Sequence, residues 1–181
     1  NIIAWDYGDY ISYTTVSAQL DWYSFNVLGG ISLGQQVGIE LVARGKRDDL
    51  AVFDSREGEN VPYLELTVNG TPVVLYPQKD VTVRAGAYRS VAYGTQNTLE
   101  VNDTGYPADD NSRRAIIVFD LSELTGIVTA ANLCVYGKTA ESNVEIMAVK
   151  HADIAWNEDT LTYANANLRM YSWEGNMSAW D

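Results

Sequence analysis

The chain has 181 residues, of which 46% are apolar, so it can bury a substantial core and is not expected to be disordered. Asp and Glu number 24 against 12 Lys and Arg, and the net charge is −12. Nucleic acids and anionic membranes bind basic patches, so this charge argues against both as partners. No apolar run approaches the ~20 residues needed to cross a bilayer, so no membrane span is expected.

Short runs of alternating apolar and polar residues follow one another along the chain. Such alternation is typical of a strand with one buried and one solvated face. Turn residues, mostly Gly and Asn-Gly, separate the runs. In chain order, the alternating runs span residues 35–44, 63–68, 80–86, 132–137 and 143–150.

Residues 115–121, AIIVFDL, begin with consecutive apolar positions, which indicates a strand covered on both faces. Residues 121–126 can form one helical turn, with Ser122 as its N-cap and Gly126 at its end. Helical periodicity is otherwise almost absent. Many short strands with regular turns predict an all-β fold, an antiparallel β-sandwich or jelly roll.

The stretch FDSREGENVPYLEL, residues 53–66, looks like the end of a domain although it lies in the first half of the chain. An apolar strand enters a charged turn, and Pro62 introduces an alternating strand. Residues 69–79 contain two of the four prolines, and we interpret them as a linker.

Aromatic residues gather near the two ends of the chain. We expect most of them to pack in the core. Tyr171, Trp173 and Trp180 are the exceptions, because their polar neighbours and the local alternation point some of these rings outward. Trp and Tyr faces stack on sugar rings and anchor interfaces, so these three residues are the candidate carbohydrate-binding site.

Three N-x-[ST] triplets, at Asn69, Asn102 and Asn176, lie in polar sequence that would tolerate a glycan. Pro72, directly after the first triplet, weakens it as a glycosylation site. Such triplets also arise by chance, so they give mild support for an extracellular or cell-surface location. Because the chain does not begin with Met and shows no signal peptide, we expect a mature protein or an excised piece.

The loop NDTGYPADDNS, residues 102–112, gathers oxygen ligands of the kind that Ca²⁺ prefers. Asp103, Asp109 and Asp110 are the candidate calcium ligands. Their spacing matches no EF-hand, so the alternative is a solvated acidic loop, which we favour. No other cofactor is suggested, because one His and one Cys cannot form the common zinc sites.

No catalytic residues are predicted. GISLG, residues 30–34, matches the G-x-S-x-G nucleophile elbow, but a β-pattern rather than a helix follows it. His151, the single histidine, lies at a strand end and is expected to be structural or solvated. Cys134, the single cysteine, is expected to be a small buried core residue.

Three segments in the second half of the chain resemble blocks of the DNRLRE domain, also called the disaggregatase-related repeat. Residues 80–103 resemble its opening block, D-x-x-V/I-R-x-G followed by YGT and L-x-V. Residues 113–137 resemble the FDLS block, and residues 154–166 resemble W-x-E followed by I-T-W-N-N-A. The last segment departs at Tyr163, where the family usually has Trp, and at Ala164, in place of the first Asn.

Two segments in the first half resemble later blocks of the same family. Residues 21–27, DWYSFNV, resemble W-x-x-x-D-V-T, with Asn26 in the Asp position. Residues 53–66 resemble the closing block, F-x-S-R-E followed by P-x-L. The resemblance covers nearly the whole chain. It implies a β-sandwich of carbohydrate-binding-module type, found in secreted surface proteins, some of them ancillary to polysaccharide-degrading enzymes, including alginate-related ones.

The order of these blocks is swapped relative to the family. Residues 1–68 correspond to the C-terminal half of such a sandwich, residues 69–79 to the linker, and residues 80–181 to the N-terminal half. The chain is then one repeat of a tandem array, or a subunit whose halves complete its neighbours, or a circular permutant that folds on itself. The sandwich is accordingly completed across the chain ends or by a neighbouring subunit.

The swapped order favours a non-catalytic structural or adhesive module of an extracellular fibre, with head-to-tail copies of itself as partners and with glycan attachment or polysaccharide binding as secondary features. The alternative is a carbohydrate-binding module of a secreted polysaccharide-acting protein, with polysaccharide as its partner. A jelly-roll lyase that uses His151 and a nearby Tyr is a distant third.

Overall fold

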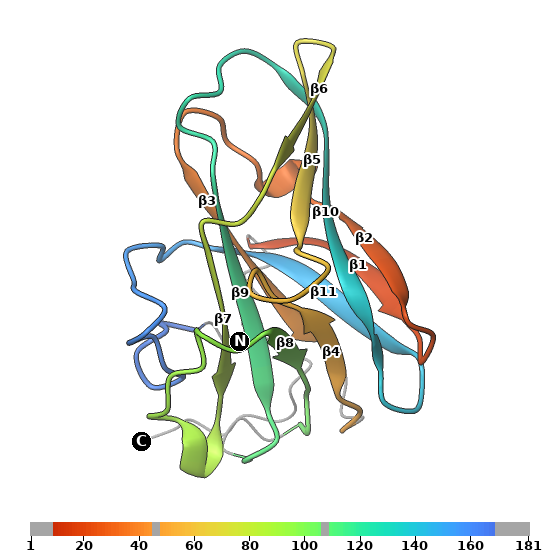
Figure 1. The fold of residues 1–181 in the computed structure, drawn as a ribbon, viewed down its shortest axis with the longest axis vertical. Coiled ribbons are helices and arrows are strands. Elements are labelled where there is room, and N and C mark those ends of the chain that lie inside the picture. The colour runs from red at the N-terminus through yellow and green to blue at the C-terminus, as the bar shows by residue number, and fades with distance from the viewer. Residues whose placement is uncertain (1–8, 45–47, 106–108, 169–181) are drawn as a thin grey trace, which may run out of the picture.

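Two antiparallel sheets pack face to face in the computed structural model, which describes residues 9–44, 48–105 and 109–168 (Figure 1). The sandwich follows from the alternating runs, because each strand buries one row of side chains between the sheets. The predicted fold class is confirmed.

Sheet A has five strands in the order β1-β11-β3-β9-β7, and every neighbouring pair is antiparallel. Its strands are β1 (Tyr10–Val16), β11 (Val144–His151), β3 (Gln36–Ala43), β9 (Arg113–Asp120) and β7 (Lys79–Arg84).

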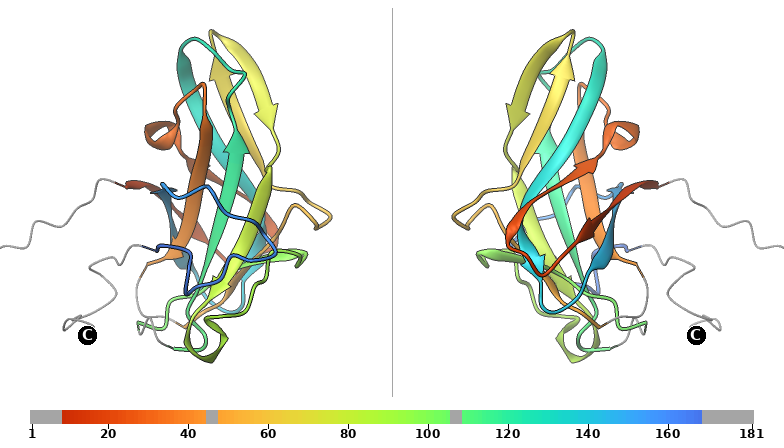
Figure 2. Two further views of the ribbon diagram at one scale, coloured as in Figure 1. Left: turned by 90° about the vertical axis from the view of Figure 1, so that its left-hand side faces the viewer. Right: turned by 90° about the vertical axis from the view of Figure 1, so that its right-hand side faces the viewer.

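Sheet B has six strands, with β6, β5, β10, β4 and β8 in order and β2 paired with β10. Residues 132–134 of β10 pair with β5 on one side and with β2 on the other, so β6, β5, β10 and β2 lie side by side at this level (Figure 2, right). Its strands are β6 (Thr71–Leu75), β5 (Tyr63–Val68), β10 (Val128–Thr139), β4 (Ala51–Asp54), β8 (Thr98–Val101) and β2 (Asp21–Asn26). Two short 3-10 helices, η1 (Leu28–Gly30) and η2 (Gly86–Tyr88), complete the elements.

The main core lies between the sheets and is built from alternate residues of the facing strands. Ile39 and Leu41 of β3 meet Leu64 and Leu66 of β5 in one buried cluster, together with Phe53 of β4. At about 25 cal/mol per Å² of apolar surface removed from water, such side chains supply most of the stabilising free energy of the sandwich.

The outer face of sheet A is covered by the segment that follows β11. Leu161 and Ala166 of this segment pack against Val81, Val83 and Ile116 of β7 and β9. The left view of Figure 2 shows the segment passing over these strands. Strand β9 is therefore buried on both faces, as its apolar sequence predicts.

Two local predictions differ from the structure. Residues 121–126 form a hydrogen-bonded turn rather than a helical turn. Residues 69–79, interpreted as a linker, include β6 and the first residue of β7. Asn69 and Gly70 have φ of 51° and 79°, the left-handed values that a two-residue hairpin turn requires, and they fold β6 back onto β5.

Strands from before and after residues 69–79 interleave in both sheets. In sheet A, β3 lies between β11 and β9, and in sheet B, β10 lies between β5 and β2. Strands from both halves of the chain thus contribute to one sandwich within a single polypeptide.

Candidate functional site

Three aromatic rings form a cluster on the outer face of sheet B. Trp22 of β2 lies with its ring centroid 5.2 Å from that of Tyr63 of β5 and 5.3 Å from that of Tyr136 of β10. The ring planes are inclined by 59° and 56°, a tilted arrangement that is favourable for aromatic pairs. Trp22 remains 42% exposed. We call Trp22, Tyr63 and Tyr136 the ring surface.

Alternation along each strand turns these rings toward solvent. Leu64 of β5 and Leu133 of β10 point into the core, so their neighbours in sequence point outward. An aromatic residue at a solvent-facing position of an amphipathic strand is a signal that the sequence carries. The expectation that most rings pack in the core overlooked this signal at Tyr63 and Tyr136. The sequence does not show that β2, β10 and β5 are neighbours.

Cys134 lies beneath the ring surface rather than in the core between the sheets. It is 8% exposed and pairs in register with Ser24 on one side and Tyr63 on the other. Its small side chain leaves room for Trp22 to reach across β10 toward Tyr63. A hydrogen bond with the Cys134 thiol is the main cause that raises the pKa of the Tyr63 hydroxyl, and burial is the second cause.

Polar and aromatic groups extend the ring surface along the same face. Tyr76 follows β6 directly and is 65% exposed. Continuing the β5–β6 register by one residue beyond Leu64 and Leu75 places Tyr76 opposite Tyr63. The side chain of Glu65, also exposed, lies on the same face of β5 as Tyr63. The arrangement offers apolar ring faces with hydrogen-bonding groups at their edges, as ligand sites typically do.

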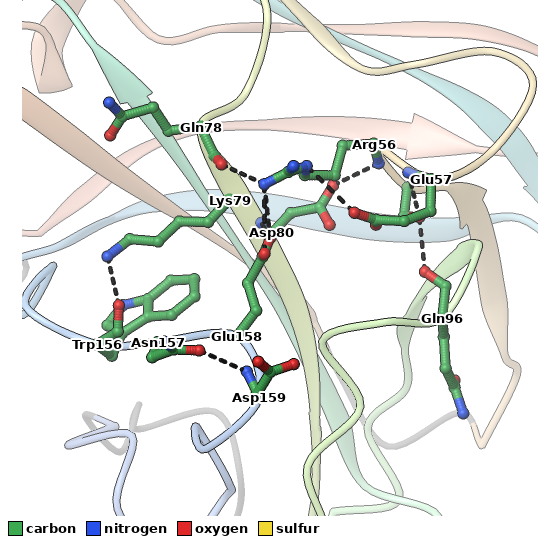
Figure 3. Close-up of polar contacts among 11 residues, drawn as sticks. Arg56, Glu57, Gln78, Lys79, Asp80, Gln96, Trp156, Asn157, Glu158 and Asp159 are labelled. Atoms are coloured by element: carbon green, nitrogen blue, oxygen red, sulfur yellow. Dashed lines mark hydrogen bonds and ion pairs between the residues drawn. The ribbon is translucent and has the colours of Figure 1, made fainter.

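A second cluster brings together three of the segments quoted in the sequence analysis (Figure 3). Arg56 comes from the SRE segment, Asp80 begins the DVTVR segment, and Glu158 belongs to the WNE segment. The Asp80 carboxylate accepts a hydrogen bond from the Arg56 backbone N–H at 2.8 Å, and Glu158 accepts one from the Asp80 N–H at 2.8 Å. The Arg56 guanidinium donates to Glu158 at 3.1 Å and also to the Gln78 carbonyl.

Lys79 belongs to the same cluster and contacts Trp156. Its ammonium donates to the carbonyls of Ile154 and Trp156 at 2.6 Å and lies 4.4 Å from the centroid of the Trp156 ring. Burial lowers the pKa of Lys79, and Glu158 and Asp153 oppose this effect. Since these groups bind one another, the cluster fastens the 152–168 segment to the edge of sheet A, and one face of the Trp156 ring is occupied by Lys79.

A third cluster lies on the outer face of sheet A. The Arg114 guanidinium donates to Glu40 at 2.9 Å, and Nδ1 of His151 lies 3.2 Å from the other carboxylate oxygen of Glu40. All three side chains are buried. Burial alone would raise the pKa of Glu40, but Arg114 and His151 outweigh it and lower the pKa. A polar cavity of about 230 Å³ adjoins Glu40 and His151.

The predicted carbohydrate-binding residues Tyr171, Trp173 and Trp180 lie outside the described residues, as does the triplet at Asn176. Asn69 lies in the β5–β6 turn, where its side-chain amide donates to the Thr125 carbonyl and accepts from the Ile127 N–H. Asn102 is 6% exposed, and its amide donates to Asp48 and to the Asn111 carbonyl. Its burial makes Asn102 the less accessible of these two for a glycan.

The predicted calcium ligands accept hydrogen bonds from their own loop or from a neighbouring one. Asp103 accepts from the Gly105 N–H at 2.7 Å, Asp109 from the Asn111 N–H at 2.8 Å, and Asp110 from the Ala87 N–H at 2.6 Å. Within residues 9–44, 48–105 and 109–168, no three His, Cys, Asp or Glu side chains lie together in a way that could hold a metal ion. Helices in the same part of the chain are all too short or too polar to span a membrane.

Comparison with known proteins identifies the family. No curated protein and no solved structure matches the chain. The model of carbohydrate-binding module family 96 matches residues 71–178, which is more than half of the chain. Tyr76 and Tyr136 fall inside the matched region, whereas Trp22 and Tyr63 precede it. The chain belongs to carbohydrate-binding module family 96.

Proposed function

We propose that this chain is a non-catalytic module that binds a polysaccharide through the ring surface of Trp22, Tyr63 and Tyr136. The observation that carries the proposal is a three-ring cluster on the outer face of a sheet, in which Trp22 is exposed and Tyr63 and Tyr136 are half-buried. Sugar rings present C–H groups that pack on aromatic faces, and their hydroxyls bond to polar groups at the rim. Membership of a carbohydrate-binding module family supports this choice of ligand.

The other clusters are less suited to a large ligand. The segment 152–168 packs on the outer face of sheet A over β7 and β9. Lys79 lies on the ring of Trp156, and Arg56 is engaged by Glu158. The outer face of sheet B carries rings that have no such cover in the described part of the chain.

The family match supports the alternative named in the sequence analysis, a carbohydrate-binding module, over the fibre subunit. We propose that the module acts outside the cell, where polysaccharides are found, as part of a secreted protein. We also propose that the swapped order of the DNRLRE-like segments reflects a permuted sandwich. Interleaved strands from both halves in one chain support that reading.

Replacing Trp22 tests the proposed function. Trp22→Ala removes the ring that contacts both others, and it should weaken polysaccharide binding by at least about tenfold, the effect of losing about 1.4 kcal/mol. Trp22→Phe keeps a ring and should retain part of the affinity. Isothermal titration and affinity electrophoresis with soluble polysaccharides give the two dissociation constants.

Tyr13→Ala is the matched control. Tyr13 is 50% exposed and pairs with Met147 on sheet A, away from the ring surface, so its removal should leave binding unchanged. Unaltered binding by a folded Trp22→Ala variant, or loss of binding in Tyr13→Ala alone, would show that the ring surface is not the site.

A further inference from the structure

Asn132 lies in the middle of a central strand, where asparagine is disfavoured. On β10 it pairs with Asn26 of β2 on one side and with Glu65 of β5 on the other. Asparagine is depleted in strands, because its short amide competes for backbone hydrogen bonds. Leu133 points into the core, so Asn132 points outward, onto the face that carries the ring surface. A residue that breaks the local preference at such a place indicates a functional constraint.

The fold does not use the side-chain amide of Asn132. It is half-buried, yet no group in the described part of the chain hydrogen-bonds to it. By contrast, the side-chain amides of Asn60, Asn69 and Asn102 each donate a hydrogen bond within the protein. A half-buried polar group without a partner costs free energy unless water or a ligand binds it. The donors and the acceptor of the Asn132 amide are therefore available to a ligand.

The neighbours of Asn132 in the same row across the sheet are less versatile. The side-chain oxygen of Asn26 already accepts from the Leu28 N–H at 3.2 Å. Glu65 has carboxylate oxygens, which only accept hydrogen bonds when the group is ionised. Asn132 can donate from its NH₂ group and accept at its oxygen at the same time. Two adjacent hydroxyls on one sugar ring match this pattern, since one can accept from the amide while the other donates to it.

Asn132 also lies beside Tyr63, across the β5–β10 pair. Tyr63 pairs with Cys134, which is two residues along β10 from Asn132 and on the same face. Such diagonal neighbours are about 7–8 Å apart, within reach of long or aromatic side chains. A sugar unit stacked on the Tyr63 ring can therefore bring its ring hydroxyls within hydrogen-bond distance of the Asn132 amide.

We infer that Asn132 is a specificity-determining residue of the ring surface and binds two neighbouring free hydroxyls of the sugar unit stacked on Tyr63. This inference rests on the proposed function and adds the feature of the polysaccharide that is recognised. The ligand is a chain whose sugar units leave such a hydroxyl pair unsubstituted. O-acetylation of either hydroxyl removes a donor and places a bulky group against the amide.

The test uses matched polysaccharides that differ only in acetylation. Xylan, mannan and alginate are each prepared in O-acetylated form and after mild alkaline deacetylation, and isothermal titration gives the dissociation constants. We expect the wild type to bind the deacetylated form of its tightest probe at least about tenfold more tightly than the acetylated form, because acetylation removes up to two hydrogen bonds.

Asn132→Ala removes the amide and leaves the three rings in place. It should weaken binding of the deacetylated form about fivefold to tenfold and reduce the preference for that form to less than about twofold. Asn97→Ala is the matched control, because it removes an exposed amide from the turn before β8, away from the ring surface. Its affinity and its preference should equal those of the wild type.

Thermal unfolding distinguishes recognition from a structural role. Since the Asn132 amide has no partner in the described part of the chain, Asn132→Ala should not lower the unfolding temperature. Asn132→Thr introduces a better strand former, so it should raise the unfolding temperature while it weakens binding. A lower unfolding temperature in both variants, with the affinity retained, would make Asn132 a structural residue and overturn the inference.

The remaining outcomes separate this inference from the proposed function. Equal binding of acetylated and deacetylated forms, abolished by Trp22→Ala, overturns the role of Asn132 but keeps the ring surface as the site. A preference for the deacetylated form that Asn132→Ala retains has the same meaning. Absence of binding to every probe, or binding untouched by Trp22→Ala, overturns the proposed function itself.

Discussion

The pKa values of two buried carboxylates, Glu40 and Asp80, shift in opposite directions. Glu40 has Arg114 and His151 as partners, and together they lower its pKa in spite of its burial. Asp80 is also buried, but it accepts a backbone hydrogen bond and lies near two other carboxylates, Glu57 and Glu158. Burial therefore prevails, and the pKa of Asp80 rises to about 7. The two pKa shifts differ in sign because the groups that contact each carboxylate differ, not because one carboxylate is buried more deeply than the other.

Asp80 makes stability depend on pH. Between its ordinary pKa of 3.8 and about 7, the folded chain holds a proton that the unfolded chain has lost. The free energy of unfolding should therefore fall as pH rises through this window, by up to about 1.4 kcal/mol per pH unit. Asp80→Asn should remove this slope and be the more stable protein at pH 8. Urea unfolding at a series of pH values measures both.

Asp159→Asn removes the same charge from an exposed position on the neighbouring segment and controls for the change in net charge. If the wild type and Asp80→Asn show parallel stability curves from pH 4 to pH 8, Asp80 does not carry a proton into the folded state. A slope of the opposite sign would mean that Arg56 dominates at Asp80, as Arg114 does at Glu40.

At the scale of elements, β10 is the strand on which sheet B depends. It pairs with β5, β4 and β2 along different parts of its length. Gly137 lies where β10 pairs with Asp21 on one side and Phe53 on the other. A Cβ atom at this position would meet the backbone carbonyl oxygen of Val52. The glycine thus allows three strands to approach at one point.

Gly137→Ala should separate β10 from β4. Because the nearest obstructing atom, the carbonyl oxygen of Val52, belongs to the backbone, the strand itself must shift, and we expect a loss of about 1–3 kcal/mol in the free energy of unfolding. The exposed neighbour Lys138→Ala should change it by less than about 0.5 kcal/mol. The urea concentrations at the unfolding midpoints of the two variants measure this difference in stability. Equal midpoints would contradict the close packing at Gly137.

Individual elements could be predicted from the sequence where alternation is regular. The runs around β3, β5, β10 and β11 each identify a strand, because period-2 patterning is local information. Strand β6 was missed, since Pro72 and Pro77 suggested an extended linker. Pro72 is compatible with β6 because this strand lies at the edge of sheet B. The Asn69-Gly70 pair, a strong hairpin signal, was the better indicator.

For the whole molecule, interleaving of the two halves has a thermodynamic consequence. Neither half contains a complete sheet, so neither should be stable alone, and the chain should unfold in one cooperative step. We expect sedimentation equilibrium to give 20.0 kDa, the mass of one chain, across a wide range of concentrations. A mass that grows with concentration would instead indicate exchange of halves between copies, as in the fibre reading.

The site was harder to predict than the fold. Which face of a strand is solvated follows from its own sequence, so Tyr63 and Tyr136 could have been placed outside from alternation alone. That Trp22 meets both depends on β2 and β5 flanking β10, and this is a property of strand order that no local pattern contains. The clustering of Arg56, Asp80 and Glu158 is likewise a long-range result, although each residue lies in a segment that the family resemblance had marked.

Cys134 gives the protein a chemical reporter at the proposed site. It is the single thiol of the chain, and it pairs in register with Ser24 and Tyr63, beside the contact between the Trp22 and Tyr63 rings. A glycan seated on those rings would close the remaining route by which an alkylating reagent reaches the sulfur. The rate of thiol modification can then serve as a label-free readout of occupancy, without any engineered cysteine.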